Sequence, residues 1–126
     1  MAVSASELTT SVAQRDEITV LSVVGDIDVA TAPAFETIVA AALAHDPIAL
    51  IIDLSNVDLL ATAGLRILAG THEKLTLGGG RFAVVANSPA TRRPIQLTDL
   101  NQLFALYLTL DDAITSLRKS QGTTTQ

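Results

Sequence analysis

The chain has 126 residues, with 13 acidic and 8 basic side chains, a formal net charge of -5 at pH 7, no cysteine and 48% hydrophobic residues. This length predicts one domain with a buried core, and the absence of cysteine excludes disulfides and thiolate metal sites. The acidic balance argues against nucleic-acid binding, which depends on Lys and Arg neutralising phosphates. Neither a secretory signal nor a membrane-spanning apolar run is present, so we expect a cytoplasmic protein.

The N-terminal region predicts a β-hairpin. Residues 8–12 are a weak strand candidate, and residues 15–17 provide its turn. Residues 18–24 are rich in β-branched side chains and predict a stronger strand, which Gly25 should stop. The short connection favours direct pairing of these two strands.

A first helix is expected after this hairpin. Thr31 is a candidate N-cap, and Pro33 suits the first helical turn. Hydrophobic residues then recur at the spacing of one buried helical face: Phe35, Ile38, Val39, Ala42 and Leu43. The helix should end near residues 45–47.

The central region predicts a strand, a loop, a second helix and another strand. Residues 48–52 form a continuous apolar run, which is typical of a central strand buried on both faces. After a loop at residues 53–61, the second helix should end at the three glycines 78–80. One face of this helix carries Leu65, Leu68, His72 and Leu75, so His72 is expected to be partly buried. Residues 82–86 predict the next buried strand.

The C-terminal region completes the pattern. A third helix should begin at residues 88–89, and Pro94 must shorten or kink it. Residues 104–108 predict the last strand, and Asp111 or Asp112 should cap a final helix.

These elements predict an α/β fold in a single domain, residues 1–126, ordered from about residue 7 to residue 119. Residues 120–126 are expected to form a disordered tail. The central sheet should be mostly parallel, with about five strands including the N-terminal hairpin strand, and about four helices packed against it. Ligands or partners approach such a sheet at the carboxyl ends of its strands. Residues 25–31, 53–62 and 86–88 should form that edge.

The strongest candidate site is Thr62, at the expected start of the second helix. Ala61 and Ala63 flank it and leave it open. As an N-cap its hydroxyl would accept a bond from a first-turn N–H and contribute about 1 kcal/mol, and residue physics alone favours this structural role. Alternatively the hydroxyl is phosphorylated, because the open N–H groups and dipole of a helix N-terminus stabilise a phosphate.

Three carboxylates at the expected sheet edge allow a different interpretation. Asp26, Asp28 and Asp53 could bind Mg²⁺ in an arrangement that resembles a response-regulator receiver domain. Against this, the last strand region has no Lys, and Asp28 can simply cap the turn at residues 29–31. No paired general acid and base and no Ser-His-Asp order stands out. We therefore expect no catalytic residues, no enzyme activity, no cofactor and no metal.

Two motifs resemble the anti-sigma factor antagonist family, the bacterial form of the STAS domain. Residues 24–33, VGDIDVATAP, are similar to the family stretch G-x-[LI]-D-x-x-T-A. Residues 53–65, DLSNVDLLATAGL, are similar to D-L-S-x-V-x-[FY]-[ML]-D-S-[ST]-G-L. The resemblance extends from about residue 8 to residue 117 and implies a STAS-like fold.

The resemblance also implies a function. Such an antagonist binds an anti-sigma factor, usually a kinase of the histidine-kinase-ATPase fold, and thereby frees a sigma factor. The anti-sigma factor phosphorylates a Ser or Thr at the start of the second helix, the antagonist then dissociates, and a phosphatase resets it. Thr62 matches the phosphoacceptor and Asp28 matches the acid near it. Ala61 departs from an Asp that is common in the family, and Ala63 from a Ser or Thr.

We expect the partner-binding surface to combine small and apolar residues around the acceptor with carboxylates at the rim. Its predicted members are Asp26, Asp28, Leu59, Leu60, Ala61, Thr62, Ala63 and Gly64. Two alternatives remain open at this point. The chain could be a STAS scaffold or sensor subunit of a stress-signalling assembly, or a receiver-like phosphotransfer domain that uses Asp53. The sequence leaves the oligomeric state open between a monomer and a weak dimer.

Overall fold

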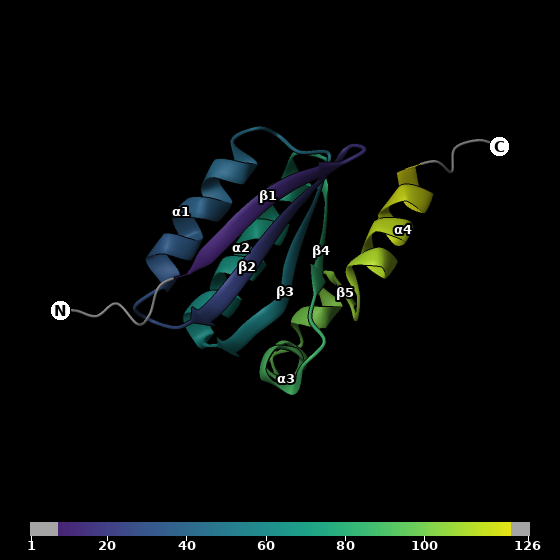
Figure 1. Ribbon diagram of the computed structural model, residues 1–126. Helices are drawn as coiled ribbons and strands as arrows, with labels where there is room; N and C mark the ends of the chain where they lie inside the picture. Colours follow the sequence, from purple (N-terminus) through teal and green to yellow (C-terminus); the bar gives the residue numbers. More distant parts are fainter. Residues whose placement is uncertain (1–7, 122–126) are drawn as a thin grey trace.

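Five strands form one sheet in the order β1-β2-β3-β4-β5 in the computed structural model, which describes residues 8–121 (Figure 1). The first two strands pair antiparallel, and all the other pairs are parallel. Four α-helices and a 3-10 turn complete the fold, so the predicted mostly parallel sheet with an N-terminal hairpin is confirmed. The elements are β1 (Thr9–Arg15), β2 (Ile18–Ile27), α1 (Ala32–Leu43), β3 (Ala49–Leu60), α2 (Thr62–Leu77), β4 (Arg81–Val85), α3 (Pro89–Leu97), η1 (Leu100–Gln102), β5 (Ala105–Tyr107) and α4 (Leu110–Gln121).

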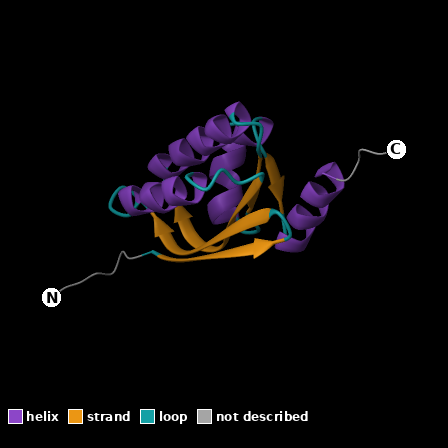
Figure 2. Ribbon diagram, turned by 90° about the horizontal axis from the view of Figure 1, so that it is seen from above, coloured by secondary structure: helices purple, strands orange, loops and turns teal. Residues whose placement is uncertain are grey.

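The sheet separates two apolar cores. On one face, α1 and α2 pack over residues such as Leu21, Leu50 and Ile52 of β2 and β3. On the other face, α4 covers residues such as Ile51 and Ala83 (Figure 2). The fully buried residues at the start of β3 therefore alternate between the two cores, which explains the continuous apolar run in the sequence.

The two strands nearest the candidate site are longer than predicted. Gly25 does not stop β2, which continues to Ile27, and the loop expected after Asp53 is strand as far as Leu60. Backbone pairing between β2 and β3 continues over these residues, with register shifts on either side of Gly25. Gly25 adopts φ 122°, a conformation that favours glycine, so this residue permits an irregular strand instead of ending it.

The end of β4 corrects the predicted edge. Val85, the last residue of β4, lies opposite Asp53, whereas β3 continues to Leu60. Residues 86–88 therefore do not reach the end of β3, and α3 packs against β3 beyond the end of β4. The edge where β2 and β3 end is built from residues 25–31 and 59–62 only.

The helix ends differ from the sequence prediction in their capping. Thr31 precedes α1 as expected, but its hydroxyl makes no capping bond. At α4, Thr109 is the cap, since its hydroxyl accepts a hydrogen bond from the Asp112 N–H at 3.1 Å. Asp111 and Asp112 lie in the first turn, where negative charge stabilises the helix dipole.

Two further boundaries differ at the C-terminal end. Pro94 lies inside α3, which is a short helix of 9 residues. The last strand is shorter than predicted, because β5 covers only Ala105–Tyr107. The sequence analysis placed the start of the tail too early, at residue 120, since α4 includes Ser120 and Gln121. Residues 122–126 lie outside the described part of the chain. Within residues 8–121 no helix combines the length and the apolar character needed to span a membrane.

Replacing the α4 cap tests this part of the fold. Thr109→Ala removes the hydroxyl that accepts the Asp112 N–H, so the free energy of unfolding should fall by about 1 kcal/mol in urea titrations. Thr109→Ser keeps a capping oxygen and is the matched control. Equal stabilities of the Ala and Ser variants would show that Thr109 does not cap α4.

Candidate partner-binding site

The candidate site lies where β2 and β3 end side by side and α2 begins. The Ala61 N–H donates to the Ile27 carbonyl at 2.8 Å, which ties the end of β3 to the end of β2. Ala61 is also the only residue between β3 and α2. The two sequence motifs therefore meet at one place, with no loop between the strand and the helix.

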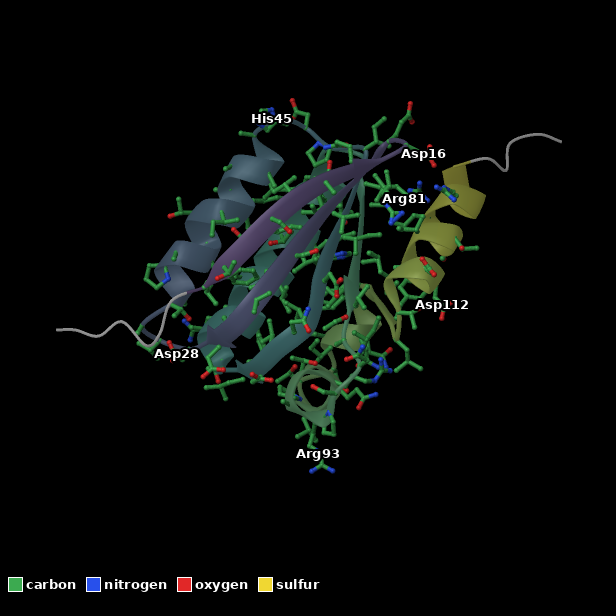
Figure 3. All side chains as sticks on the ribbon, in the orientation of Figure 1. Asp16, Asp28, His45, Arg81, Arg93 and Asp112 are labelled. Atoms are coloured by element: carbon green, nitrogen blue, oxygen red, sulfur yellow. The ribbon has the colours of Figure 1, made fainter. Side chains whose placement is uncertain are left out.

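Asp28 organises the turn that leads from β2 into α1. One of its carboxylate oxygens, Oδ1, accepts hydrogen bonds from the N–H groups of Ala30 and Thr31, both at 2.9 Å. The Thr31 hydroxyl accepts from the Asp28 N–H at 2.9 Å and donates to the Asp26 carbonyl at 2.7 Å. Asp28 thus caps this turn, as one reading of the sequence proposed. It lies at the end of the sheet opposite the hairpin turn at Asp16 (Figure 3).

Thr62 is the first residue of α2 and its side chain is exposed. The N-cap position belongs to Ala61, with φ -85° and ψ 171°, so the prediction of Thr62 as N-cap is wrong by one residue. Alanine has no side-chain acceptor, and α2 begins without a side-chain cap. The positive end of the helix dipole therefore lies next to an exposed hydroxyl.

Leu60 and Gly64 face inward, in contrast to the other predicted surface residues. Leu60 is only 3% exposed and belongs to the core beneath α1 and α2. An ideal Cβ on Gly64 would lie 2.6 Å from Ile27 Cγ2 and 2.8 Å from Leu60 Cδ1, so any larger residue here would force these core side chains to shift. These two residues support the surface from below and are not available for direct contact with a partner.

The outer surface at this junction is formed by other side chains. Leu59 is 45% exposed and lies opposite the exposed Asp26 in the β2–β3 pair. Val29, which the sequence analysis missed, is 79% exposed in the turn that Asp28 holds. The sequence analysis ended the strand at Gly25 and therefore gave no reason to single out Val29. The exposure of Val29 depends on the longer strand and on the tight turn that follows it.

A groove runs from this junction between α1 and α2. It has a volume of about 470 Å³, and Val29 and Ala63 line its end beside Thr62. Glu36, Arg66 and Lys74 add charges along it. The site therefore combines a small apolar centre with charged borders.

The receiver-like interpretation is wrong, because the three carboxylates do not come together. Asp53 pairs with Ser22 and Val85 in the middle of the sheet, while Asp26 pairs with Leu59 near the far end of β3. The Asp53 carboxylate accepts hydrogen bonds from the Ser55 N–H and hydroxyl at 3.0 and 2.6 Å. Among the described residues no group of three acidic or histidine side chains could hold a metal ion.

His72 lies where the helical pattern predicted. It is half-buried, and its ring centroid is 6.4 Å from that of Phe104. This contact makes His72, a residue of α2, part of the packing between that helix and Phe104.

The STAS domain family model matches residues 9–113. The chain belongs to the STAS domain family. This STAS domain is 45% identical over 111 residues to the anti-sigma-F factor antagonist RsfB of Mycobacterium tuberculosis, with 88% of this chain and 90% of RsfB covered. The resemblance expected from the two motifs is confirmed.

Solved structures agree with this assignment. An anti-sigma factor antagonist from Mycobacterium paratuberculosis has 51% sequence identity and a TM-score of 0.86 to this STAS domain, covering 93% of this chain and 99% of that one. The anti-sigma factor antagonist SpoIIAA in its unphosphorylated form shares the fold, with a TM-score of 0.72, 18% identity, and 87% and 96% of the two chains covered.

Substitution of Gly64 tests the close packing under the site. Gly64→Ala should lower the free energy of unfolding by about 1–3 kcal/mol, since the added methyl group overlaps two core side chains. Gly70→Ala in the same helix is the matched control, because its Cβ would meet nothing within 4 Å. That control should gain about 1 kcal/mol from helix propensity. Thermal and urea unfolding measure both changes, and a neutral Gly64→Ala would contradict the close contact.

Proposed function

We propose that this STAS domain is an anti-sigma factor antagonist, which acts by binding an anti-sigma factor and thereby frees a sigma factor. The observation that carries the proposal is the identity of 45% and 51%, over nearly the whole chain, to two proteins that bear this function in their names. Such an antagonist works by occupying its partner and needs no catalytic activity of its own. It acts where the sigma factor is found, in the cytoplasm.

The proposed switch is phosphorylation of Thr62 by the anti-sigma factor, a kinase of the histidine-kinase-ATPase fold, with a phosphatase that removes the phosphate. The exposed position of Thr62 at the start of α2 supports this proposal. Ala61 and Ala63 are small, so a kinase can reach the hydroxyl from several directions. The uncapped helix start stabilises the negative charge of the product.

Phosphorylation would change the charge of the binding surface. A phosphate adds about -1.5 to -2 charges at neutral pH. The surface already has Asp26 exposed beside Leu59 and Asp28 holding the adjoining turn. A partner that fits the uncharged apolar centre would then have to bury a phosphate, which is costly unless the charge is paired. The physical effect of the switch is thus loss of affinity.

A charge-mimicking substitution tests the switch. Thr62→Glu should weaken binding to the anti-sigma factor about a hundredfold, or about 2.8 kcal/mol, whereas Thr62→Ala should bind like the wild type. Thr37→Glu makes the same chemical change at an exposed position of α1 and is the matched control. Each variant serves as bait in a bacterial lysate, mass spectrometry identifies the captured anti-sigma factor, and calorimetry with the purified pair gives the affinities.

The outcomes separate the function from the switch. Capture by wild type, Thr62→Ala and Thr37→Glu, but not by Thr62→Glu, supports both. Equal affinities of all variants would keep the antagonist function and remove Thr62 as the switch. If no bait captures an anti-sigma factor, the scaffold or sensor role is favoured instead. Incubation of the purified pair with ATP, followed by peptide mapping, tests directly whether phosphate appears on Thr62.

A further inference from the structure

Arg66 lies one helical turn after Thr62 on the outward face of α2. The two residues are four positions apart, so they are neighbours on the helix surface, with their Cβ atoms about 5–6 Å apart. Both side chains are exposed. The buried residues of α2, such as Leu68 and Leu75, lie on the opposite side, so no core residue separates Thr62 from Arg66.

The guanidinium of Arg66 has no acidic partner among the described residues. The ion pair that those residues form joins Arg118 to Asp16 and does not involve Arg66. The helix positions three and four residues away from Arg66 carry no charge: Thr62, Ala63, Ala69 and Gly70. The guanidinium is therefore available to an anion that arises next to it on the helix.

The other charges near Thr62 do not offer a phosphate a second cation. Asp26 lies near the end of β2, and Glu36 lines the α1–α2 groove on the side of α1. The cations that line this groove are Arg66 and Lys74. Lys74 follows Thr62 by twelve residues, which is about 18 Å along the helix and beyond the Debye length of about 8 Å at physiological ionic strength. Along α2, a phosphate on Thr62 would thus have Arg66 alone within reach.

The chemistry of the two groups favours a strong pair. A guanidinium can donate two parallel hydrogen bonds to two oxygens of one phosphate, which fixes the orientation of both groups. The order of the charges also suits α2, because an anion in the first turn followed by a cation four residues later agrees with the helix dipole.

We propose that Arg66 binds the phosphate on Thr62 within the same chain and holds it as a dianion at the start of α2. This inference rests on the proposed phosphorylation of Thr62 and names the residue that positions the added group. The second ionisation of a phosphate monoester has a pKa of about 6, and a cation beside the phosphate lowers this pKa because it favours the more highly charged form. The partner would then meet a fixed double charge at neutral pH.

Phosphorus NMR of the phosphorylated full chain tests the pairing. Phosphothreonine is placed at position 62 during translation, so the sample does not depend on the kinase. The pKa of the phosphate should be about 0.3–0.5 unit higher in Arg66→Gln than in the chain that keeps Arg66. Arg66→Lys keeps the charge without the planar fork and should recover part of this shift. The carboxylates near Thr62 are the same in all these proteins, so their effect cancels in the comparison.

Lys74→Gln is the matched control for net charge. It removes one positive charge from the same helix and the same groove, but at a distance where salt screens the interaction. The phosphate should therefore titrate as it does in the chain that keeps both cations. A second readout is the NMR signal of the Arg66 Nε–H group, which should shift when the phosphate loses its last proton. The corresponding signal of Arg93 on α3, which points away from the rest of the molecule (Figure 3), should not shift.

Two results would overturn the pairing of Arg66 with the phosphate. The first is an unchanged phosphate pKa in Arg66→Gln. The second is an equal shift in Lys74→Gln and Arg66→Gln, which would show a general effect of net charge. Both results leave the antagonist function and the phosphorylation of Thr62 intact.

Failure of the proposed switch has a different signature. If incubation of the purified pair with ATP adds no phosphate to Thr62, the switch is removed, and the regulatory role of Arg66 is removed with it. If phosphate appears on Thr62 but titrates alike with and without Arg66, only the role of Arg66 is removed.

Discussion

The extended pairing of β2 with β3 holds the candidate site together. Beyond the end of β4 these two strands continue as a pair, and the hydrogen bond from the Ala61 N–H to the Ile27 carbonyl closes it. Gly64 then packs against Ile27 and Leu60, which fixes the first turn of α2 on the ends of both strands. The Asp28 turn begins at the same place. Every exposed group at the site, from Asp26 to Thr62, is positioned by this pair of strands.

Those parts of the fold that depend on burial could be predicted from the sequence. The apolar run before Asp53 indicated a central strand, and the helical spacing that begins at Phe35 indicated the face of α1 that packs on the sheet. Phe35, Val39 and Ala42 are buried as that spacing requires. The order of strands and helices then left few possible topologies, because crossovers between parallel strands are right-handed. The two motifs placed Thr62 beside the ends of the central strands.

Long-range pairing explains what the sequence could not reveal. Three polar residues looked like loop residues in the sequence: Asp26, Asn56 and Asp58. They belong to β2 and β3 because the backbones of these two strands pair with each other. The inward positions of Leu60 and Gly64 follow from the register of that pair, which no local pattern contains. The Thr109 cap was missed for a local reason, since two aspartates near it were equally good candidates by composition. Asp53 looked like a ligand until its place in the middle of β3 was known.

The single residue between β3 and α2 has a consequence for how a signal could pass through this protein. A long loop could accommodate a modification of Thr62 by a shift of its own backbone, which would leave the rest of the surface unchanged. Here the sheet holds Ala61 on one side and α2 begins on the other side, so the backbone has no room to shift. The proposed phosphorylation of Thr62 would therefore change the surface that a partner meets at a point fixed to both the sheet and the helix. In that proposal, removal of the phosphate would restore the surface directly, because no loop has to be rebuilt.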